Sequence, residues 1–143
     1  MINEIKQAIA QKIHEQYPSA TIYDEDIPQN FKKPSFLITL IEHTYGKRLN
    51  NKYNSTASFD VAYFSDKDKS EIKSDCQEVQ VNLLRAFDLI DVFRAIGVFR
   101  AQNLQANITD NVLHVTFNIR YSEVKPIEEV KMQTQTTNTN VKE

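Results

Sequence analysis

Residues 112–121 constrain the possible fold more than any other stretch of the sequence. Apolar and polar side chains alternate along the whole stretch, and the apolar positions are Leu113, Val115, Phe117, Ile119 and Tyr121. Strict alternation is typical of a β-strand that has one buried face and one face in water. The chain therefore contains a sheet with one solvent-exposed face.

A tight turn before this strand sets the register of a hairpin. Asp110 and Asn111 both tolerate left-handed backbone conformations, as a two-residue hairpin turn requires. The predicted apolar pairs are Ile108 with Leu113, Ala106 with Val115 and Leu104 with Phe117, and the predicted polar pairs are Asn107 with His114, Gln105 with Thr116 and Asn103 with Asn118. In this register apolar residues lie opposite apolar residues and polar residues opposite polar ones, which favours it.

Composition limits the classes of protein that this chain can belong to. Its 143 residues suit one ordinary domain, and only two glycines and four prolines favour regular structure. A net charge of −2 gives no general attraction to nucleic acids or anionic membranes. The N-terminus lacks the apolar core of a signal peptide, and Cys76 has no partner for a disulfide. We expect a protein made in the cytoplasm, with no membrane partner and no sequence-specific nucleic-acid partner.

Two amphipathic helices are predicted from apolar spacing. The first covers residues 2–16, where Ile2, Ile5, Ile9 and Ile13 form the stripe. The second begins near a capping box made by Asp68 and Glu71. Its apolar stripe consists of Ile72, Cys76, Val79, Leu83, Phe87 and Ile90. Both helices should pack their apolar faces on a sheet.

Three further strands are predicted at residues 20–25, 35–41 and 55–64. Residues 35–41 are apolar on both faces, which predicts a central strand covered on both sides in the assembled protein. The loop at residues 26–34 carries Phe31 as an anchor. We therefore expect one α+β domain, with a largely antiparallel or mixed sheet of about five strands, two helices packed on it, and the order α-β-β-β-α-β-β.

The last part of the chain differs from the rest. Residues 125–143 end in a Gln/Thr/Asn run, and residues 132–143 contain almost nothing apolar. Such a composition cannot bury enough surface to offset the entropy of ordering. We expect a domain over residues 1–124 and a polar tail over residues 125–143 that is flexible in the free subunit.

A possible calcium loop begins at Asp66. Asp66, Asp68 and Ser70 occupy its first, third and fifth positions, but the sixth position is Glu71 where the loop geometry requires glycine. A helix N-terminus explains these residues better than calcium does.

Other reactive residue types are scattered. His14, His43 and His114 belong to three different predicted elements and lack metal-ligand spacing. Cys76 lies on an apolar helix stripe and is interpreted as a packing residue. Two glycines cannot build a phosphate-binding loop. We expect no catalytic residue, no cofactor and no metal site.

One segment concentrates side chains that favour interactions. Residues 42–54 are polar, basic and aromatic and should form a long projecting hairpin or loop. The candidate contact residues are His43, Tyr45, Lys47, Arg48, Asn51 and Tyr53. Tyrosine and arginine are enriched at protein interfaces, and the rest of the chain is not basic. A protein partner is therefore favoured over nucleic acid, with a plain solvated loop as the alternative.

Several stretches resemble the small tail terminator proteins of bacteriophages and of related tail-like particles from Gram-positive bacteria. They are residues 1–16, Ile22-Tyr23-Asp24-Glu25 with Phe31 and Pro34, Ser58-Phe59-Asp60-Val61 with Tyr63 and Phe64, and Val112-Leu113-His114. The similarity extends to about residue 124. The turn reads Asp110-Asn111 where similar sequences often have Asp-Gly.

The resemblance implies a structural virion protein without catalysis. Subunits of this kind form a ring, commonly a hexamer, that caps the growing tail tube and offers a joining surface to the head. The implied partners are other copies of the chain, the tail tube protein, the head-tail connector protein and, in a contractile tail, the sheath protein. The implied location is the virion tail, assembled in the host cytoplasm. The alternatives are a neck or head-completion connector, and a small cytoplasmic ligand-binding domain or enzyme unrelated to virions.

Overall fold

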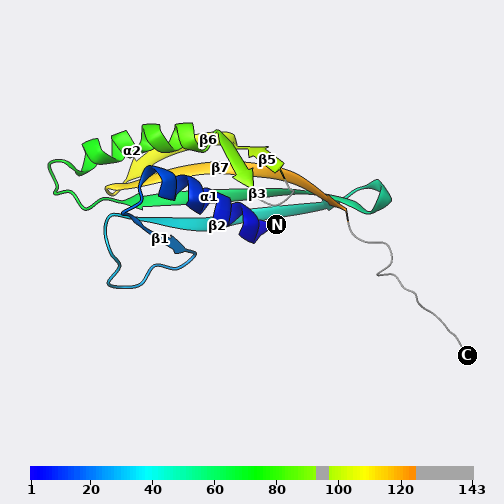
Figure 1. Cartoon of the computed structure of the whole chain (residues 1–143), viewed down its shortest axis with the longest axis horizontal. Coiled ribbons are helices and arrows are strands. Elements are labelled where there is room, and N and C mark those ends of the chain that lie inside the picture. The colour runs from blue at the N-terminus through cyan, green and yellow to red at the C-terminus, as the bar shows by residue number, and fades with distance from the viewer. Residues whose placement is uncertain (93–96, 125–143) are drawn as a thin grey trace, which may run out of the picture.

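The structure, a computed structural model, describes residues 1–92 and 97–124, with the side chains of residues 51, 89–92, 97, 98, 123 and 124 left aside. A five-stranded mixed sheet carries two helices on one face (Figure 1). Its strands lie in the order β1 (Thr21–Asp24), β2 (Ser35–Lys47), β3 (Lys52–Phe64), β7 (Val112–Val124) and β6 (Gln102–Thr109). The helices are α1 (Ile2–Gln16) and α2 (Ile72–Ala86). These elements confirm the predicted α+β fold.

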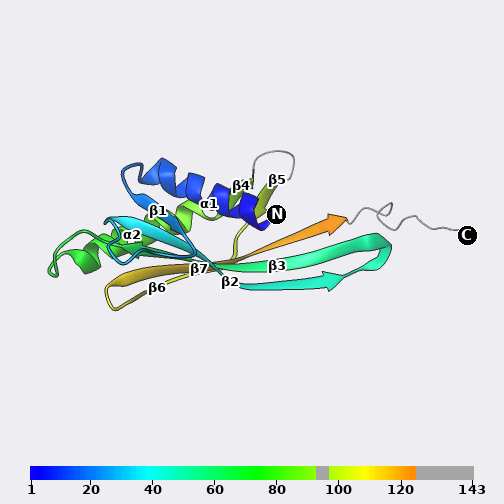
Figure 2. The same ribbon diagram turned by 90° about the horizontal axis from the view of Figure 1, so that it is seen from below.

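Three short elements complete the described chain. The 3-10 helix η1 (Leu49–Asn51) joins β2 to β3. The strands β4 (Leu89–Val92) and β5 (Gly97–Arg100) form a separate antiparallel pair. This pair lies on the same side of the large sheet as the helices (Figure 2). The predicted tail at residues 125–143 lies outside the described residues, so its flexibility and the domain boundary at residue 124 stay predictions.

The core forms between the helices and the apolar face of the sheet. Alternate residues of β3 and β7 point inward, so that Phe59 and Phe117 are fully buried and their rings lie 5.9 Å apart. The α1 stripe supplies Ile5, Ile9 and Ile13, each with no exposed surface. Burying a side chain of this size contributes roughly 1.5–3 kcal/mol to stability. The predicted apolar faces of helix and strand are therefore the faces that meet.

The hairpin of β6 and β7 has most of its predicted register. Asp110 and Asn111 have φ angles of 51° and 63°, so both occupy the left-handed region. Four predicted pairs are confirmed: Ile108 with Leu113, Ala106 with Val115, Asn107 with His114 and Gln105 with Thr116. The alternating pattern and the turn chemistry thus act together.

The far end of this hairpin differs from the prediction. Gln102, not Asn103, lies opposite Asn118, and the register shifts between Gln102 and Gln105. The predicted pair Asn103–Asn118 is therefore wrong. Leu104 and Asn103 together stand opposite Phe117, so the predicted pair Leu104–Phe117 falls within the bulge and stays untested. Asn103 has a φ of 55°, which asparagine tolerates, and a bulge can form there. The Leu104 side chain is partly buried and packs against the core.

Helix α2 is shorter than predicted at both ends. The Asp68 carboxylate accepts a hydrogen bond from the Ser70 hydroxyl at 2.8 Å, and no side chain caps the helix. The predicted capping box is therefore wrong, because the Asp68 side chain is used within the turn that precedes Ile72. At the other end Ile90 lies in β4, so it does not continue the helix stripe.

Strand β2 is longer than predicted and is covered on one side only within the described chain. It continues beyond residue 41 to Lys47. Phe36 and Ile38 are buried on the inner face, whereas Ile41 is 57% exposed. The predicted cover on both sides concerned the assembled protein, and for the assembly it stays a prediction. The preceding loop is anchored as expected, because the Phe31 ring lies 5.0 Å from Phe64.

Candidate subunit interface on the projecting arm

The distal parts of β2, β3 and β7 extend past the helices as a three-stranded arm, defined here as residues 42–57 and 119–124 (Figure 2). The pairing of β2 with β3 is continuous from His43–Ala57 to Lys47–Tyr53, and β7 follows β3 from Ala57–Ile119 to Lys52–Val124. The predicted projecting hairpin is confirmed. The pairing with β7 makes it a regular ribbon instead of a loose loop.

Local sequence explains how the arm forms. Threonine and tyrosine, which favour extended backbone, fill much of β2 and β3 here. At the tip the Arg48 amide donates a hydrogen bond to the Lys52 carbonyl. Asn50 has a φ of 60°, a left-handed conformation that asparagine adopts readily. These residues close the ribbon without a glycine at the turn.

One face of the arm brings together four of the six predicted contact residues. His43, Tyr45 and Lys47 alternate along β2 and so share the face that carries the helices farther along the sheet. The Tyr45 ring stacks on Tyr53 at 4.9 Å with an interplanar angle of 17°. Tyr45 remains 58% exposed. A partner would therefore meet a flat aromatic surface with a lysine beside it.

The base of this aromatic face joins the body of the molecule. His43 Nε2 lies 3.0 Å from the Tyr121 hydroxyl, and the Tyr121 ring in turn meets Phe99 of β5 edge-on at 6.4 Å. Sequence reasoning missed Tyr121 as part of this surface. Its position in the alternating stripe of β7 was a usable signal, because that stripe continues onto the arm.

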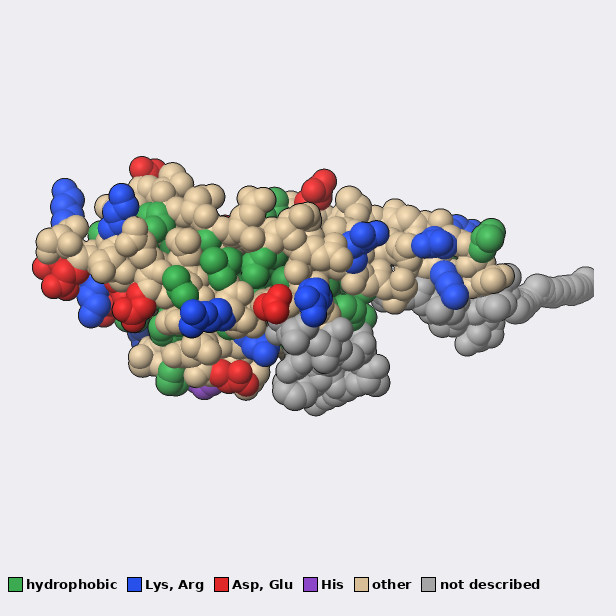
Figure 3. Space-filling view, turned by 90° about the horizontal axis from the view of Figure 1, so that it is seen from above, with side chains coloured by type: hydrophobic (Ala, Val, Ile, Leu, Met, Phe, Trp, Pro, Cys, Tyr) green, Lys and Arg blue, Asp and Glu red, His purple; other side chains and the backbone are tan. Residues whose placement is uncertain are grey.

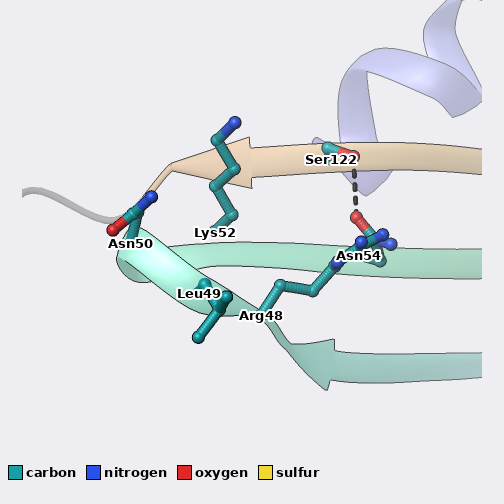
Figure 4. Close-up of a pocket in the computed structure, with 6 residues that line it drawn as sticks. All are labelled: Arg48, Leu49, Asn50, Lys52, Asn54 and Ser122. Carbon is teal, nitrogen blue, oxygen red and sulfur yellow. Dashed lines mark hydrogen bonds between the residues drawn. The ribbon is translucent and has the colours of Figure 1, made fainter.

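The tip presents a second, different surface. Arg48 lies beside Asn54, whose side-chain oxygen accepts a hydrogen bond from the Ser122 hydroxyl at 2.8 Å (Figure 4). A hollow of about 430 Å³ is lined by Arg48, Leu49, Asn50, Lys52, Asn54 and Ser122. Leu49 is 85% exposed and was missed from the sequence, although it is an isolated apolar residue among polar ones. The side chain of Asn51 lies outside the described residues.

Charge separates the arm from the rest of the chain. The arm contains the basic residues Lys47, Arg48, Lys52 and Arg120 and the acidic residues Glu42 and Glu123, a net charge of +2. Since the whole chain carries −2, the remainder carries −4. Figure 3 shows basic side chains toward the end of the arm, and both acidic and basic ones over the body on the face in view. The arm therefore suits a partner surface that is negative.

The polar clusters of the body hold the fold together. The Asp75 carboxylate accepts hydrogen bonds from the hydroxyls of Tyr63, at 2.7 Å, and Ser65, which joins α2 to β3. Burial, together with this bond to Asp75, raises the pKa of Tyr63. Burial likewise raises the pKa of the Cys76 thiol, which faces the core as a packing residue. A raised pKa keeps both groups protonated, as structural donors require.

The three histidines do not gather. His114 lies 3.1 Å from Asp60 on the wet face of the sheet, His43 contacts Tyr121 on the arm, and His14 is exposed on α1. Within residues 1–92 and 97–124 no three histidine, cysteine or carboxylate side chains are grouped as metal ligands. The same residues include no helix with the length and hydropathy needed to span a bilayer.

A family model described as phage tail terminator protein matches residues 4–131. The chain belongs to this family. The match extends from the first turn of α1 past the end of β7, so it covers all the described residues except the first three. The resemblance seen in the sequence is confirmed. It places the chain in a family of structural proteins of phage tails that interact with other tail proteins. Comparison with curated proteins finds no match.

Proposed function

We propose that this tail terminator forms a closed ring that caps the phage tail tube, stops its polymerisation and offers the joining surface for the head. A hexamer is the ring expected from the family resemblance. The partners on its two faces are the tail tube protein and the head-tail connector protein, with a sheath protein added if the tail is contractile. Assembly takes place in the host cytoplasm, and the finished ring is part of the virion.

The projecting arm is the observation that carries this proposal. In a ring each subunit contacts its neighbours through two different patches, because the interface between copies is heterologous. The arm extends beyond the core with Tyr45 and Leu49 exposed, so it reaches away from its own body. Large apolar and aromatic side chains at such a place favour contact with another protein.

Charge supports the choice of a second copy as one occupant. The arm carries +2 and the remainder of the chain −4. An arm that lies against the body of the next subunit therefore brings opposite charges together, which favours correct orientation during assembly. His43, Tyr45, Lys47, Arg48, Asn51 and Tyr53 are the proposed contact residues.

The test is a triple replacement of Tyr45, Arg48 and Tyr53 by alanine in the phage or tail-like particle. We expect weaker ring assembly or capping, seen by electron microscopy as tails of irregular length, while the melting temperature changes by only about a few degrees. A matched control replaces Lys69, in the turn before α2, together with Lys73 and Val81 on the exposed side of α2, and should leave tails normal.

Two outcomes would contradict different parts of the proposal. Tails of uniform length with heads attached in the triple variant would remove the arm from the interface. Uniform tails in a strain that lacks the protein entirely would remove the terminator function, and well-capped tails without heads in that strain would favour the head-completion alternative.

A further inference from the structure

None of the described strands lies beside the outer edge of β2 along the arm. Strand β1 pairs with β2 only from Ser35 to Ile38. The next outward amide, that of Leu40, donates to the Glu25 carboxylate at 2.9 Å. Beyond a register shift between Leu40 and Glu42, no described strand lies on this side of the arm. The edge from His43 to Lys47 is thus the open side of the ribbon.

The direction of the backbone groups on this edge follows from one hydrogen bond. The Arg48 amide donates to the Lys52 carbonyl, so the Arg48 amide points toward β3. Bonded and non-bonded pairs alternate in an antiparallel ladder. With the continuous register from residue 47 back to 43, Thr44 and Gly46 direct their amides toward β3. The amides and carbonyls of His43, Tyr45 and Lys47 therefore point outward.

This edge lacks the usual protection against pairing. Natural sheets guard exposed edges with proline, inward-pointing charges or very short strands. Between His43 and Lys47 there is no proline, and the one charge stands at the end of the segment. All of these residues are exposed. An open edge of this length is a template for another strand.

We propose that the edge from His43 to Lys47 receives an edge strand from a second copy of this chain, so that the sheet continues from one subunit to the next. The inference rests on the proposed ring and specifies how its subunits join. The donor is a strand from the β6–β7 side of the neighbouring sheet.

Two features favour a second copy over another partner. The sheet begins with β1 and β2 and ends with β7 and β6, so each copy offers two different ends that can join head to tail. Strand β6 carries no charged side chain, and it does not repel the basic arm. The charge of −4 on the remainder of the chain attracts the arm to the body of its neighbour.

Residue-resolved amide hydrogen exchange tests the inference on the full chain, at low concentration and in the assembled state. In the monomer we expect slow exchange at Thr44 and Gly46 and fast exchange at His43, Tyr45 and Lys47. In the assembly the second group should slow by at least about tenfold, because each amide gains a partner. Continued fast exchange at these three amides in the assembly would overturn strand addition while leaving the ring intact.

The same measurement identifies the donor. Newly protected amides on β6, or on residues 119–124 of β7, support the assignment to the β6–β7 side of a second copy. Protection of the β2 edge with no change on either strand would overturn that assignment. A wild-type chain that stays monomeric at every concentration would overturn the ring and the strand addition together.

Proline replacement gives an independent check. Tyr45→Pro removes an outward amide, which an edge position tolerates, whereas Tyr45→Ala removes the same side chain and keeps the amide. We expect the proline variant to assemble about tenfold more weakly than the alanine variant, as loss of a paired amide predicts. Equal assembly of the two would count against strand addition. Gly46→Pro serves as a control, because it removes an amide that bonds to β3 within the hairpin. Its melting temperature shows how far stability falls when the hairpin itself is broken.

Discussion

The body and the arm share the strands β2, β3 and β7, yet they differ in what covers these strands. In the body Phe59 and Val61 of β3 lie fully buried beneath the helices, whereas Tyr53, farther back on the same face of the same strand, is only half-buried. The side-chain alternation continues unchanged between them. Alternation therefore assigns a residue to one face of the sheet. Whether that face becomes core or remains available to a partner depends on whether helices cover it.

The largest expected effect comes from the covered face of the body. Phe117→Ala should lower the free energy of unfolding by about 3–5 kcal/mol, because it leaves a cavity between Phe59 and Phe87. Its neighbour on the wet face, Asn118, makes a hydrogen bond of 2.7 Å with Ser58. Asn118→Ala should cost only about 1 kcal/mol. If chemical denaturation gave equal losses of unfolding free energy for the two variants, the helices would not make one face of the sheet a core and leave the other in solvent.

The next effect concerns the attachment of α2 to the sheet. Asp75→Ala leaves the buried hydroxyls of Tyr63 and Ser65 without their shared acceptor. A loss of about 1–3 kcal/mol is expected, the usual cost of unsatisfied buried polar groups. Asp75→Asn keeps an acceptor oxygen and should retain most of the stability. If both variants have the melting temperature of the wild type, this cluster does not hold the helices on the sheet.

The arm should respond much less to truncation. Tyr45→Ala removes one ring of the stacked pair with Tyr53 but exposes no core. We expect a change of about 0.5 kcal/mol in the free energy of unfolding, the scale of one cross-strand pair. A loss as large as that of Phe117→Ala would show that the arm is part of the cooperative core, and the contrast between the two regions would fail.

The smallest effect lies at the boundary between body and arm. Burial tends to lower the pKa of Lys6, but hydrogen bonds to Glu25 and Asp24 outweigh it and raise that pKa. The bond from Lys6, followed by the one from the Leu40 amide, lowers the pKa of Glu25. Because the Glu25 side chain is 42% exposed, the pair should contribute at most a few tenths of a kcal/mol.

The sign of the pH dependence follows from the lowered pKa of Glu25. Its contribution is complete above the ordinary carboxyl pKa of about 4.3 and is lost as the pH falls through the lower folded value. Melting of wild type and Glu25→Gln should therefore differ slightly at pH 7 and converge near pH 3. A difference that grows toward acid would contradict this assignment.

Sequence periodicity was sufficient for the elements and their faces. The stripe of Ile5, Ile9 and Ile13, the alternation in β3 and β7 and the turn at Asp110 and Asn111 all involve residues close together in the chain. A repeat of 3.6 or 2 residues is a local property, so it can be read without knowing the fold. The same local reading placed His43, Tyr45, Lys47 and Tyr53 in a projecting segment.

Only the tertiary structure decided where those patterns end and what lies over them. The bulge at Asn103, the use of Asp68 by Ser70 and the place of Ile90 in β4 depend on competing contacts that periodicity does not register. The open edge of β2 exists because β1 stops at Asp24, a strand separated from the arm in sequence. Pairing and cover arise between distant segments, and for this physical reason the pairing of the arm with β7 and the free edge of β2 became visible only in three dimensions.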